Sequence, residues 1–214
     1  MSKIKKSWMV LGTLAVLLIF IIAGTIFYNN CLRNPASEAA HLSSYLIEQD
    51  NIMDVMLENM TITPSGNAEL DFLLGMVAHH QAAVELSHSY LNHGSSRKFK
   101  KLVREIIEEQ EEEIEEMSRL ADRLQKNPTD PEAYEIYMDS YNNTLSLHQH
   151  IKHGTSTDMT VEEAFAQGMV KHHQMAIDMA NAVYNVTNNS EVQELAQDIV
   201  DMQTDEIQTI LAVR

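Results

Sequence analysis

The sequence predicts an all-α protein, a helical bundle made of two tandem antiparallel helical units that follow one N-terminal transmembrane helix. Only four prolines and seven glycines occur in 214 residues, and good helix formers dominate while alternating β-branched runs are scarce. A long segment also recurs after 93 residues, so that His79 is matched by His172. An uncharged apolar run lies near the N-terminus, and it predicts the membrane helix.

Residues 1–30 form the first element, a membrane anchor or a signal segment. Three lysines within residues 3–6 precede an uncharged run at residues 8–27, which has about the 20 residues that a spanning helix needs. A signal peptide usually has a shorter apolar region and a small-residue cleavage site, so the anchor is favoured. Because basic residues stay on the cytoplasmic side, we expect residues 28–214 outside the cytoplasm, in the periplasm or the extracellular space.

The composition is strongly acidic. There are 31 Asp and Glu against 15 Lys and Arg, which gives a formal net charge of −16. This charge repels nucleic acid and anionic lipid surfaces, so we expect metal ions as partners and no nucleic acid. Cys31 is the only cysteine, which excludes an internal disulfide and a thiolate metal cluster. It could at most link two chains, so a homodimer is possible.

One helical pattern occurs twice in the chain. GMVAHHQAAVEL at residues 75–86 returns as GMVKHHQMAIDM at residues 168–179. The same shift continues without a gap and takes Glu113 to Glu206. Self-similarity over such a length indicates that one structural unit is repeated.

Each of the two predicted units, residues 35–127 and 128–214, is expected to contain three helices. A proline stands at the start of each unit, and short Gly, Ser and Asn turns make the later two helices of each unit antiparallel. Thr160 and Glu163 form a capping-box pattern before one helix, and Ser190 is expected to cap the last helix. The expected helices are residues 38–60, 68–92, 97–125, 131–152, 161–184 and 191–212.

The repeated residues converge on one side of each helix pair. With about 100° per residue, Met169, His172, Met175 and Met179 share one stripe, and His173 lies beside it. On the facing helix of each unit, a glutamine, a glutamate and an apolar residue recur at helical spacing. The candidate metal ligands are therefore Met76, His79, His80, Glu113 and Met117 in the first unit, and Met169, His172, His173, Met175, Met179 and Glu206 in the second.

Core packing is the main alternative for these residues, because a methionine stripe at helical spacing usually belongs to a hydrophobic core. Two adjacent imidazoles, however, are costly to bury unless their nitrogens find partners, and the pair occurs twice. We therefore expect a metal site. Thioether ligands select Cu(I), and imidazole suits copper or zinc, so copper, with Cu(I) favoured, is the expected ion.

A di-iron oxidoreductase is a second alternative. Helical bundles build di-iron centres from Glu-x-x-His pairs, and Glu85 and His88 fit this pattern once. The repeat places Asp178 and Asn181 at the equivalent positions, which removes the second histidine. We therefore expect a binding protein and not an enzyme.

The doubled pattern G-M-V-x-H-H-Q-x-A, followed on the next helix by Q-x-x-E-I, resembles the CopM-like family of bacterial copper-binding proteins. The resemblance covers residues 67–117 and 160–210. It implies a ferritin-like four-helix fold and a role in copper tolerance outside the cytoplasm, by sequestering copper or handing it on. Leu86 and Ile210 depart from the pattern, since the equivalent residue of the other unit is a methionine in each case, Met179 for Leu86 and Met117 for Ile210. The resemblance assigns copper binding to Met76, His79, His80, Met169, His172, His173 and Met179.

Overall fold

A computed structural model describes residues 35–124, 129–149 and 158–213 of the chain. The chain divides into two units, residues 1–40 and 41–214, and each is described by itself. The described residues form helices and contain no strand, so the predicted all-α class is confirmed. The helices are α2 (Pro35–Asn59), α3 (Ala68–His93), α4 (Arg97–Leu124), α5 (Pro131–Gln149), α6 (Val161–Tyr184) and α7 (Ser190–Val213).

Side-chain caps fix where the inner helices begin. Thr160 and Glu163 form the predicted capping box at α6, since each side chain bonds the backbone N–H of the other residue. The Asn67 side chain accepts a hydrogen bond from the backbone of Leu70 and begins α3. The predicted N-cap of α7 is wrong by one residue. The side chain of Asn189, and not that of Ser190, accepts a hydrogen bond from the backbone N–H of Glu191. Both Asn and Ser suit this position, so sequence alone does not separate them.

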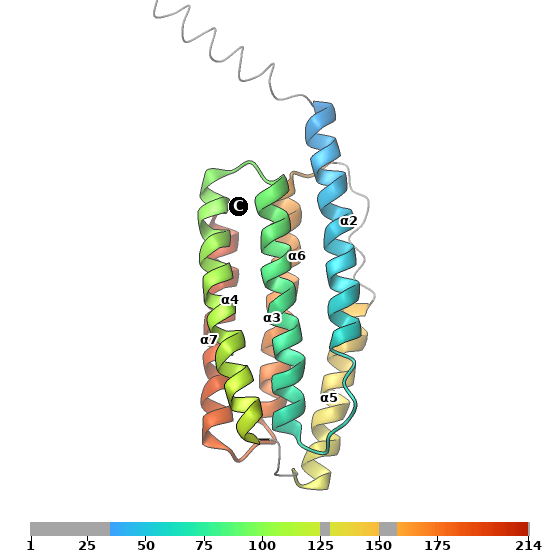
Figure 1. Cartoon of the computed structure of the whole chain (residues 1–214), viewed down its shortest axis with the longest axis vertical. Coiled ribbons are helices and arrows are strands. Elements are labelled where there is room, and N and C mark those ends of the chain that lie inside the picture. The colour runs from blue at the N-terminus through green and yellow to red at the C-terminus, as the bar shows by residue number, and fades with distance from the viewer. Residues whose placement is uncertain (1–34, 125–128, 150–157, 214) are drawn as a thin grey trace, which may run out of the picture. The chain divides into compact units, whose positions relative to one another are not determined.

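Helices α3, α4, α6 and α7 form a four-helix bundle within residues 41–214 (Figure 1). Helices α3 and α4 make one antiparallel hairpin, and α6 and α7 make the other. The two hairpins meet mainly through α3 and α6. Helices α2 and α5 lie beside this bundle on the side of α3 and α6. The later two helices of each predicted unit thus pair as expected, while the boundaries of the units stay a prediction.

Two apolar clusters fill opposite ends of the bundle. The first cluster joins the N-terminal half of α3 to the C-terminal half of α6 and includes Phe72 and Val183. The second cluster joins the other halves of the same helices and includes Tyr90 and Phe165. Helices α3 and α6 are therefore antiparallel, and the region between the two clusters lies at the middle of all four bundle helices.

The glycine of the first repeated motif lets α5 pack closely against α3. A Cβ atom built at Gly75 would overlap the hydroxyl group of Tyr141 on α5. That tyrosine is buried, and its hydroxyl group donates a 2.7 Å hydrogen bond to the carbonyl oxygen of Met60. The absence of a side chain at Gly75 thus leaves room for Tyr141, whose hydrogen bond to Met60 connects α5 to the residue that follows α2.

The predicted N-terminal anchor, residues 1–30, lies outside the described residues, as does Cys31. Within the part of the chain that the structure describes, no helix is long and apolar enough to span a membrane.

We predict that Gly75→Ala lowers the free energy of unfolding. Alanine is the better helix former, but the overlap with Tyr141 should outweigh this gain and cost about 1–3 kcal/mol, as other overpacked cores do. Urea unfolding followed by circular dichroism measures the change. Adding Tyr141→Phe to Gly75→Ala should recover part of the loss, since the hydroxyl oxygen is the nearest atom. Unchanged stability of Gly75→Ala would contradict this account of the packing.

Candidate metal centre

A layer of polar side chains crosses the middle of the bundle and separates the two apolar clusters. Each bundle helix contributes two of its residues near its midpoint, and every one of them is at most 7% exposed. We call this group the polar layer. It consists of His79 and His80 on α3, Gln110 and Glu113 on α4, His172 and His173 on α6, and Gln203 and Glu206 on α7.

His79 and His172 form the centre of the polar layer. The Nε2 atom of His79 lies 3.0 Å from the carbonyl oxygen of His172, and Nε2 of His172 lies 3.1 Å from the carbonyl oxygen of His79. The ring centroids are 3.6 Å apart. A carbonyl oxygen can only accept a hydrogen bond, so each ring carries its proton on Nε2 and keeps the lone pair on Nδ1.

His80 and His173 lie against a glutamate of the neighbouring helix. The Nε2 atom of His80 is 3.0 Å from Oε2 of Glu113, and Nε2 of His173 is 3.1 Å from Oε2 of Glu206. The Gln110 side chain lies 3.4 Å from a carboxyl oxygen of each glutamate and connects the two pairs. The neighbouring histidines of each motif thus have different surroundings, one backbone and one carboxyl.

The Nδ1 atoms of all four histidines are buried and have no hydrogen-bond partner in the protein. Buried polar atoms in folded proteins are nearly always paired, so four such atoms in one layer require an explanation. A histidine that binds a metal through one nitrogen typically donates the N–H of the other to a carbonyl or carboxyl group. His79, His80 and His172 have this arrangement. The donor set therefore fits a metal ion.

Burial keeps three histidines of the polar layer, His79, His172 and His173, uncharged. Loss of contact with water lowers the pKa of His79 and His172 well below the ordinary value, and the other imidazoles of the layer lower it further. The pKa of His173 falls to about 3 for the same reasons. Burial raises the pKa of Glu206 to about 9, and the hydrogen bond and negative charge of the nearby Glu109 contribute to this rise. Neutral imidazole is the form that binds metal ions, so these rings are ready to act as ligands at neutral pH.

The methionines are distributed unequally about the polar layer. Met76, Met117, Met175 and Met179 are fully buried and belong to the first apolar cluster. Met169 belongs to the second cluster. We call the first four residues the methionine flank. Met76 and Met175 are each one helical turn from a histidine of the layer, and Met117 is one turn from Glu113, so these side chains neighbour the layer along their helices.

The opposite flank lacks most of these sulfur atoms. The 93-residue shift matches Leu86 to Met179 and Ile210 to Met117. Both Leu86 and Ile210 are buried in the second apolar cluster. The two sides of the layer therefore contain similar imidazoles but different neighbouring donors.

The structure buries every candidate ligand that the sequence predicts, in the layer or in an adjoining cluster. Whether these residues bind metal stays a prediction. Gln110 and Gln203 belong to the layer although they were not among the candidates, and their place beside the glutamates at helical spacing is the signal that could have included them. Among the described residues, no three side chains of His, Cys, Asp or Glu are arranged to hold a metal ion by themselves.

The pair expected for a di-iron centre lies elsewhere. Glu85 and His88 are both exposed on the outer face of α3, so they do not face the bundle interior. The structure therefore gives this alternative no support.

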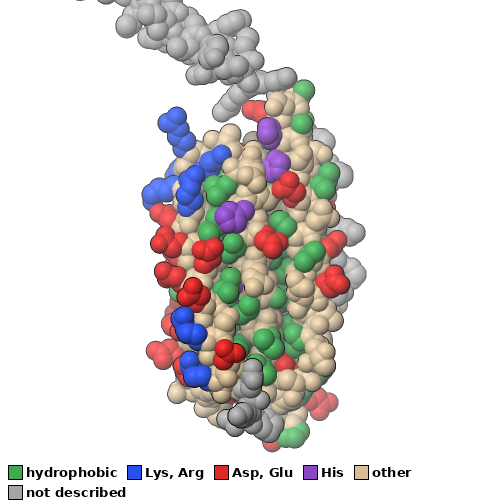
Figure 2. Space-filling view, in the orientation of Figure 1, with side chains coloured by type: hydrophobic (Ala, Val, Ile, Leu, Met, Phe, Trp, Pro, Cys, Tyr) green, Lys and Arg blue, Asp and Glu red, His purple; other side chains and the backbone are tan. Residues whose placement is uncertain are grey.

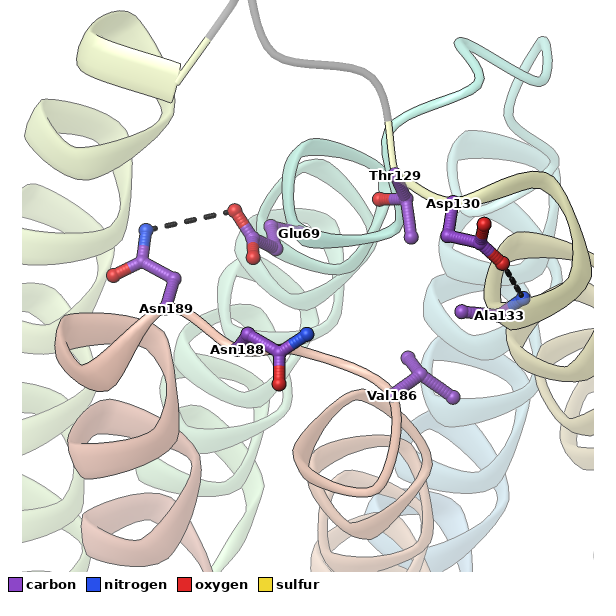
Figure 3. A pocket seen from close by; sticks show the side chains of 7 residues that line it. All are labelled: Glu69, Thr129, Asp130, Ala133, Val186, Asn188 and Asn189. Carbon is purple, nitrogen blue, oxygen red and sulfur yellow. Dashed lines mark hydrogen bonds between the residues drawn. The ribbon is translucent and has the colours of Figure 1, made fainter.

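A pocket of about 290 Å³ lies at the end of the bundle, away from the layer, and contains no histidine or methionine (Figure 3). It is lined by Glu69, Thr129, Asp130, Ala133, Val186, Asn188 and Asn189. Its two carboxylates already have structural partners. Asp130 accepts hydrogen bonds from the first backbone N–H groups of α5, and Glu69 binds the side chains of Thr187 and Asn189. These contacts hold the helix ends together and do not suggest a metal site.

The fold and the layer define a class of protein, a helical bundle with a buried layer of histidines flanked by methionines. The chain belongs to the family described as Domain of unknown function (DUF305), whose model matches residues 48–121 and 69–214. No curated protein gives a significant sequence match.

The chain is similar to several solved structures. CopM in its silver-bound form is 27% identical, with a TM-score of 0.50, over 67% of this chain and 93% of that one. CopM in its Cu(I)-bound form is 28% identical, with a TM-score of 0.49 over the same shares. A DUF305 fragment from Deinococcus radiodurans is 25% identical, with a TM-score of 0.49, over 71% of this chain and 95% of that one.

We predict that acid destabilises the metal-free protein. Three layer histidines have lowered pKa values in the folded state. Below about pH 6.5 the unfolded chain therefore binds more protons than the folded chain, and the free energy of unfolding decreases as the pH is lowered. Glu206, with its raised pKa, acts in the opposite direction, but it is one group against three. The urea midpoint, measured with a chelator present, should fall between about pH 7 and about pH 5.

The exposed His88 provides the control for this titration. His88→Gln should keep the full dependence on pH, because His88 is exposed and lies outside the polar layer. A urea midpoint that does not change over this range in the unaltered protein would contradict the burial of neutral histidines.

Proposed function

We propose that this chain binds copper, as Cu(I), between the polar layer and the methionine flank, and that it sequesters copper or hands it on. The observation that carries the proposal is the set of four buried Nδ1 atoms without partners, next to the methionine flank, which is formed by four of the buried methionines of the first apolar cluster. Imidazole and thioether together favour Cu(I) over harder ions. Solved CopM has a silver-bound form, and silver, like Cu(I), is a soft ion, which supports the proposal.

The methionine flank is the side of the layer on which we place the ion. Its candidate ligands are Met76, Met117 and Met175, with an Nδ1 atom from a histidine of the layer. Histidine and carboxyl groups alone do not converge on a metal position among the described residues, so sulfur ligands are needed to complete the site. Met169 is the only methionine among the buried residues of the second apolar cluster, so we expect one strong site and not two equal ones.

The surrounding residues prepare this site for a soft, monovalent ion. The hydrogen bonds of His79 and His172 to backbone carbonyls fix the ring that presents Nδ1. Three neutral rings and a protonated Glu206 reduce the charge of the interior, which favours a monovalent ion over a divalent one. Methionine resists the oxidation to disulfide that threatens cysteine ligands. The polar layer and the methionine flank together therefore provide imidazole and thioether donors in a buried environment.

We further propose that the copper-binding bundle acts outside the cytoplasm, anchored by the N-terminal segment, and contributes to copper tolerance. The support for this location is the order of charged and apolar residues within residues 1–30, since lysines before an apolar segment stay in the cytoplasm. Protease added to cells whose outer envelope has been opened, but whose inner membrane is intact, should digest the bundle. Digestion only after the inner membrane is broken would contradict this location.

Cu(I) should stabilise the full chain, purified in detergent because of its apolar N-terminus. A ligand that binds only the native state adds about 2.7 kcal/mol at 100 times its Kd, so the melting temperature should rise with Cu(I). An excess of Zn²⁺ should not remove the Cu(I), because zinc has little affinity for thioethers. Loss of Cu(I) to an equal concentration of zinc would contradict the assignment to a soft ion.

Met175→Leu should weaken Cu(I) binding by about tenfold or more, since one ligand is lost. The change conserves volume, so stability without metal should fall by less than about 1.5 kcal/mol. Met159→Leu is the matched control, because Met159 precedes α6 and lies outside the layer and its flank. A titration with a Cu(I)-selective chelator measures both variants. Equal affinity in the two would show that Met175 only packs.

Adding methionine to the opposite flank should create a second site. The double variant Leu86→Met with Ile210→Met supplies the counterparts of Met179 and Met117, while Met169 already corresponds to Met76. The same titration should then show an additional bound Cu(I) per chain. If the stoichiometry stays that of the unaltered protein, the methionines are not what distinguishes the two flanks.

A further inference from the structure

Two histidines outside the polar layer face each other at the surface between α2 and α3. The Nδ1 atoms of His41 and His93 are 3.5 Å apart, and the ring planes are inclined at 64°. Figure 2 shows histidine side chains on this face, with acidic side chains beside them. His41 is exposed, and the His93 side chain is 14% exposed. Water and ions therefore reach the pair directly.

Glu48 holds the ring of His93 in place. Its Oε1 atom lies 3.0 Å from Nε2 of His93, and its Oε2 atom accepts a 2.6 Å hydrogen bond from the hydroxyl group of Ser89. A carboxylate oxygen only accepts hydrogen bonds, so the Nε2–H group of His93 donates to Glu48 and the lone pair of His93 is on Nδ1, the atom that faces His41. This carboxylate–histidine arrangement is the one that metal-binding histidines commonly have.

Buried side chains support the group formed by His41, Glu48 and His93. Tyr45 is fully buried, and its ring centroid is 6.4 Å from that of His93. His41, Tyr45 and Glu48 are separated by four and three residues, so they share the face of α2 that meets α3. Ser89 and His93 are likewise one turn apart on α3. The ring of His93 is therefore oriented before any ligand arrives.

The separation of the two nitrogens fits a bridging cation better than a direct hydrogen bond. A hydrogen bond from N–H usually spans about 2.7–3.2 Å, which is shorter than the 3.5 Å observed. Two nitrogens bound to Zn²⁺ at about 2.0–2.1 Å with a tetrahedral angle lie about 3.4 Å apart. Nitrogen ligands with water in the remaining positions suit ions of borderline softness.

We propose that His41 and His93 bind a divalent transition-metal ion, Zn²⁺ or Cu²⁺, through their Nδ1 atoms, with Glu48 as the positioning residue. Water completes the coordination on the exposed side. The acidic chain, with a net charge of −16, attracts such cations. This site is separate from the polar layer, because His93 follows His80 by 13 residues on α3, or about 20 Å along the helix.

This surface site differs in chemistry from the proposed Cu(I) site. Its donors are imidazole and water in contact with solvent, whereas the layer combines imidazole with buried thioethers. A bound ion would also connect α2 to the C-terminal end of α3 through one residue of each helix. The protein would then hold ions of two kinds at two places.

Zn²⁺ is the probe that tests this site, because it is redox-inert and has little affinity for thioethers. Calorimetric titration of the full chain in detergent should show one site that His41→Gln and His93→Gln each remove. Glu48→Gln should weaken it by about 10–100-fold, as loss of an orienting carboxylate does. His88→Gln is the matched control, an exposed histidine on the same helix, and should bind Zn²⁺ as the unaltered chain does.

The ligand atoms and the independence of the site are tested by two further measurements. Nitrogen-15 shifts of the imidazoles should show ligation at Nδ1 of both rings, and Met175→Leu should leave Zn²⁺ binding unchanged even if it abolishes Cu(I) binding. Unaltered Zn²⁺ affinity in His41→Gln and His93→Gln would overturn the proposal. Ligation through Nε2, or loss of the zinc site in Met175→Leu, would overturn it as well.

Discussion

The burial of four imidazoles at one level of a four-helix bundle is the constraint on which the rest of the structure depends. Such rings are stable in an apolar interior only if their N–H groups find acceptors. His79 and His172 find them in each other's backbone, which requires α3 and α6 to be antiparallel and in close contact. His80 and His173 lie against Glu113 and Glu206, which sets how α4 and α7 align with their partners. The arrangement leaves the Nδ1 atom of each ring without a hydrogen-bond partner in the protein, and for His173 the Nε2 atom as well.

The two flanks of this layer differ in chemistry although the sequence motif that precedes them is the same. The imidazoles are nearly equivalent on both sides, because the motif that carries them is the same. The methionine flank has sulfur at two positions where the 93-residue shift gives Leu86 and Ile210 in the second apolar cluster. Leucine and isoleucine fill similar volume without offering a soft donor. Packing is thus conserved between the two sides while the chemistry differs.

Much of the fold could be predicted from the sequence because its signals are local. Helix ends follow from caps and turns, and α6 begins at the predicted residue because Thr160 and Glu163 form a capping box. Burial of the histidine pairs followed from helical periodicity and the repeat. The bond between His79 and the carbonyl of His172 could not be predicted, since it depends on how the two hairpins meet. The pairing of His41 with His93 likewise joins residues of two helices whose sequences show no matching pattern.

X-ray absorption at the copper edge of the Cu(I)-loaded full chain tests the central claim most directly, because it reports the atoms bound to the metal. A site between the polar layer and the methionine flank should show both sulfur and imidazole nitrogen at bonding distance. The sulfur contribution should fall in Met175→Leu. Copper surrounded by nitrogen and oxygen alone, with a spectrum that Met175→Leu does not change, would contradict the account.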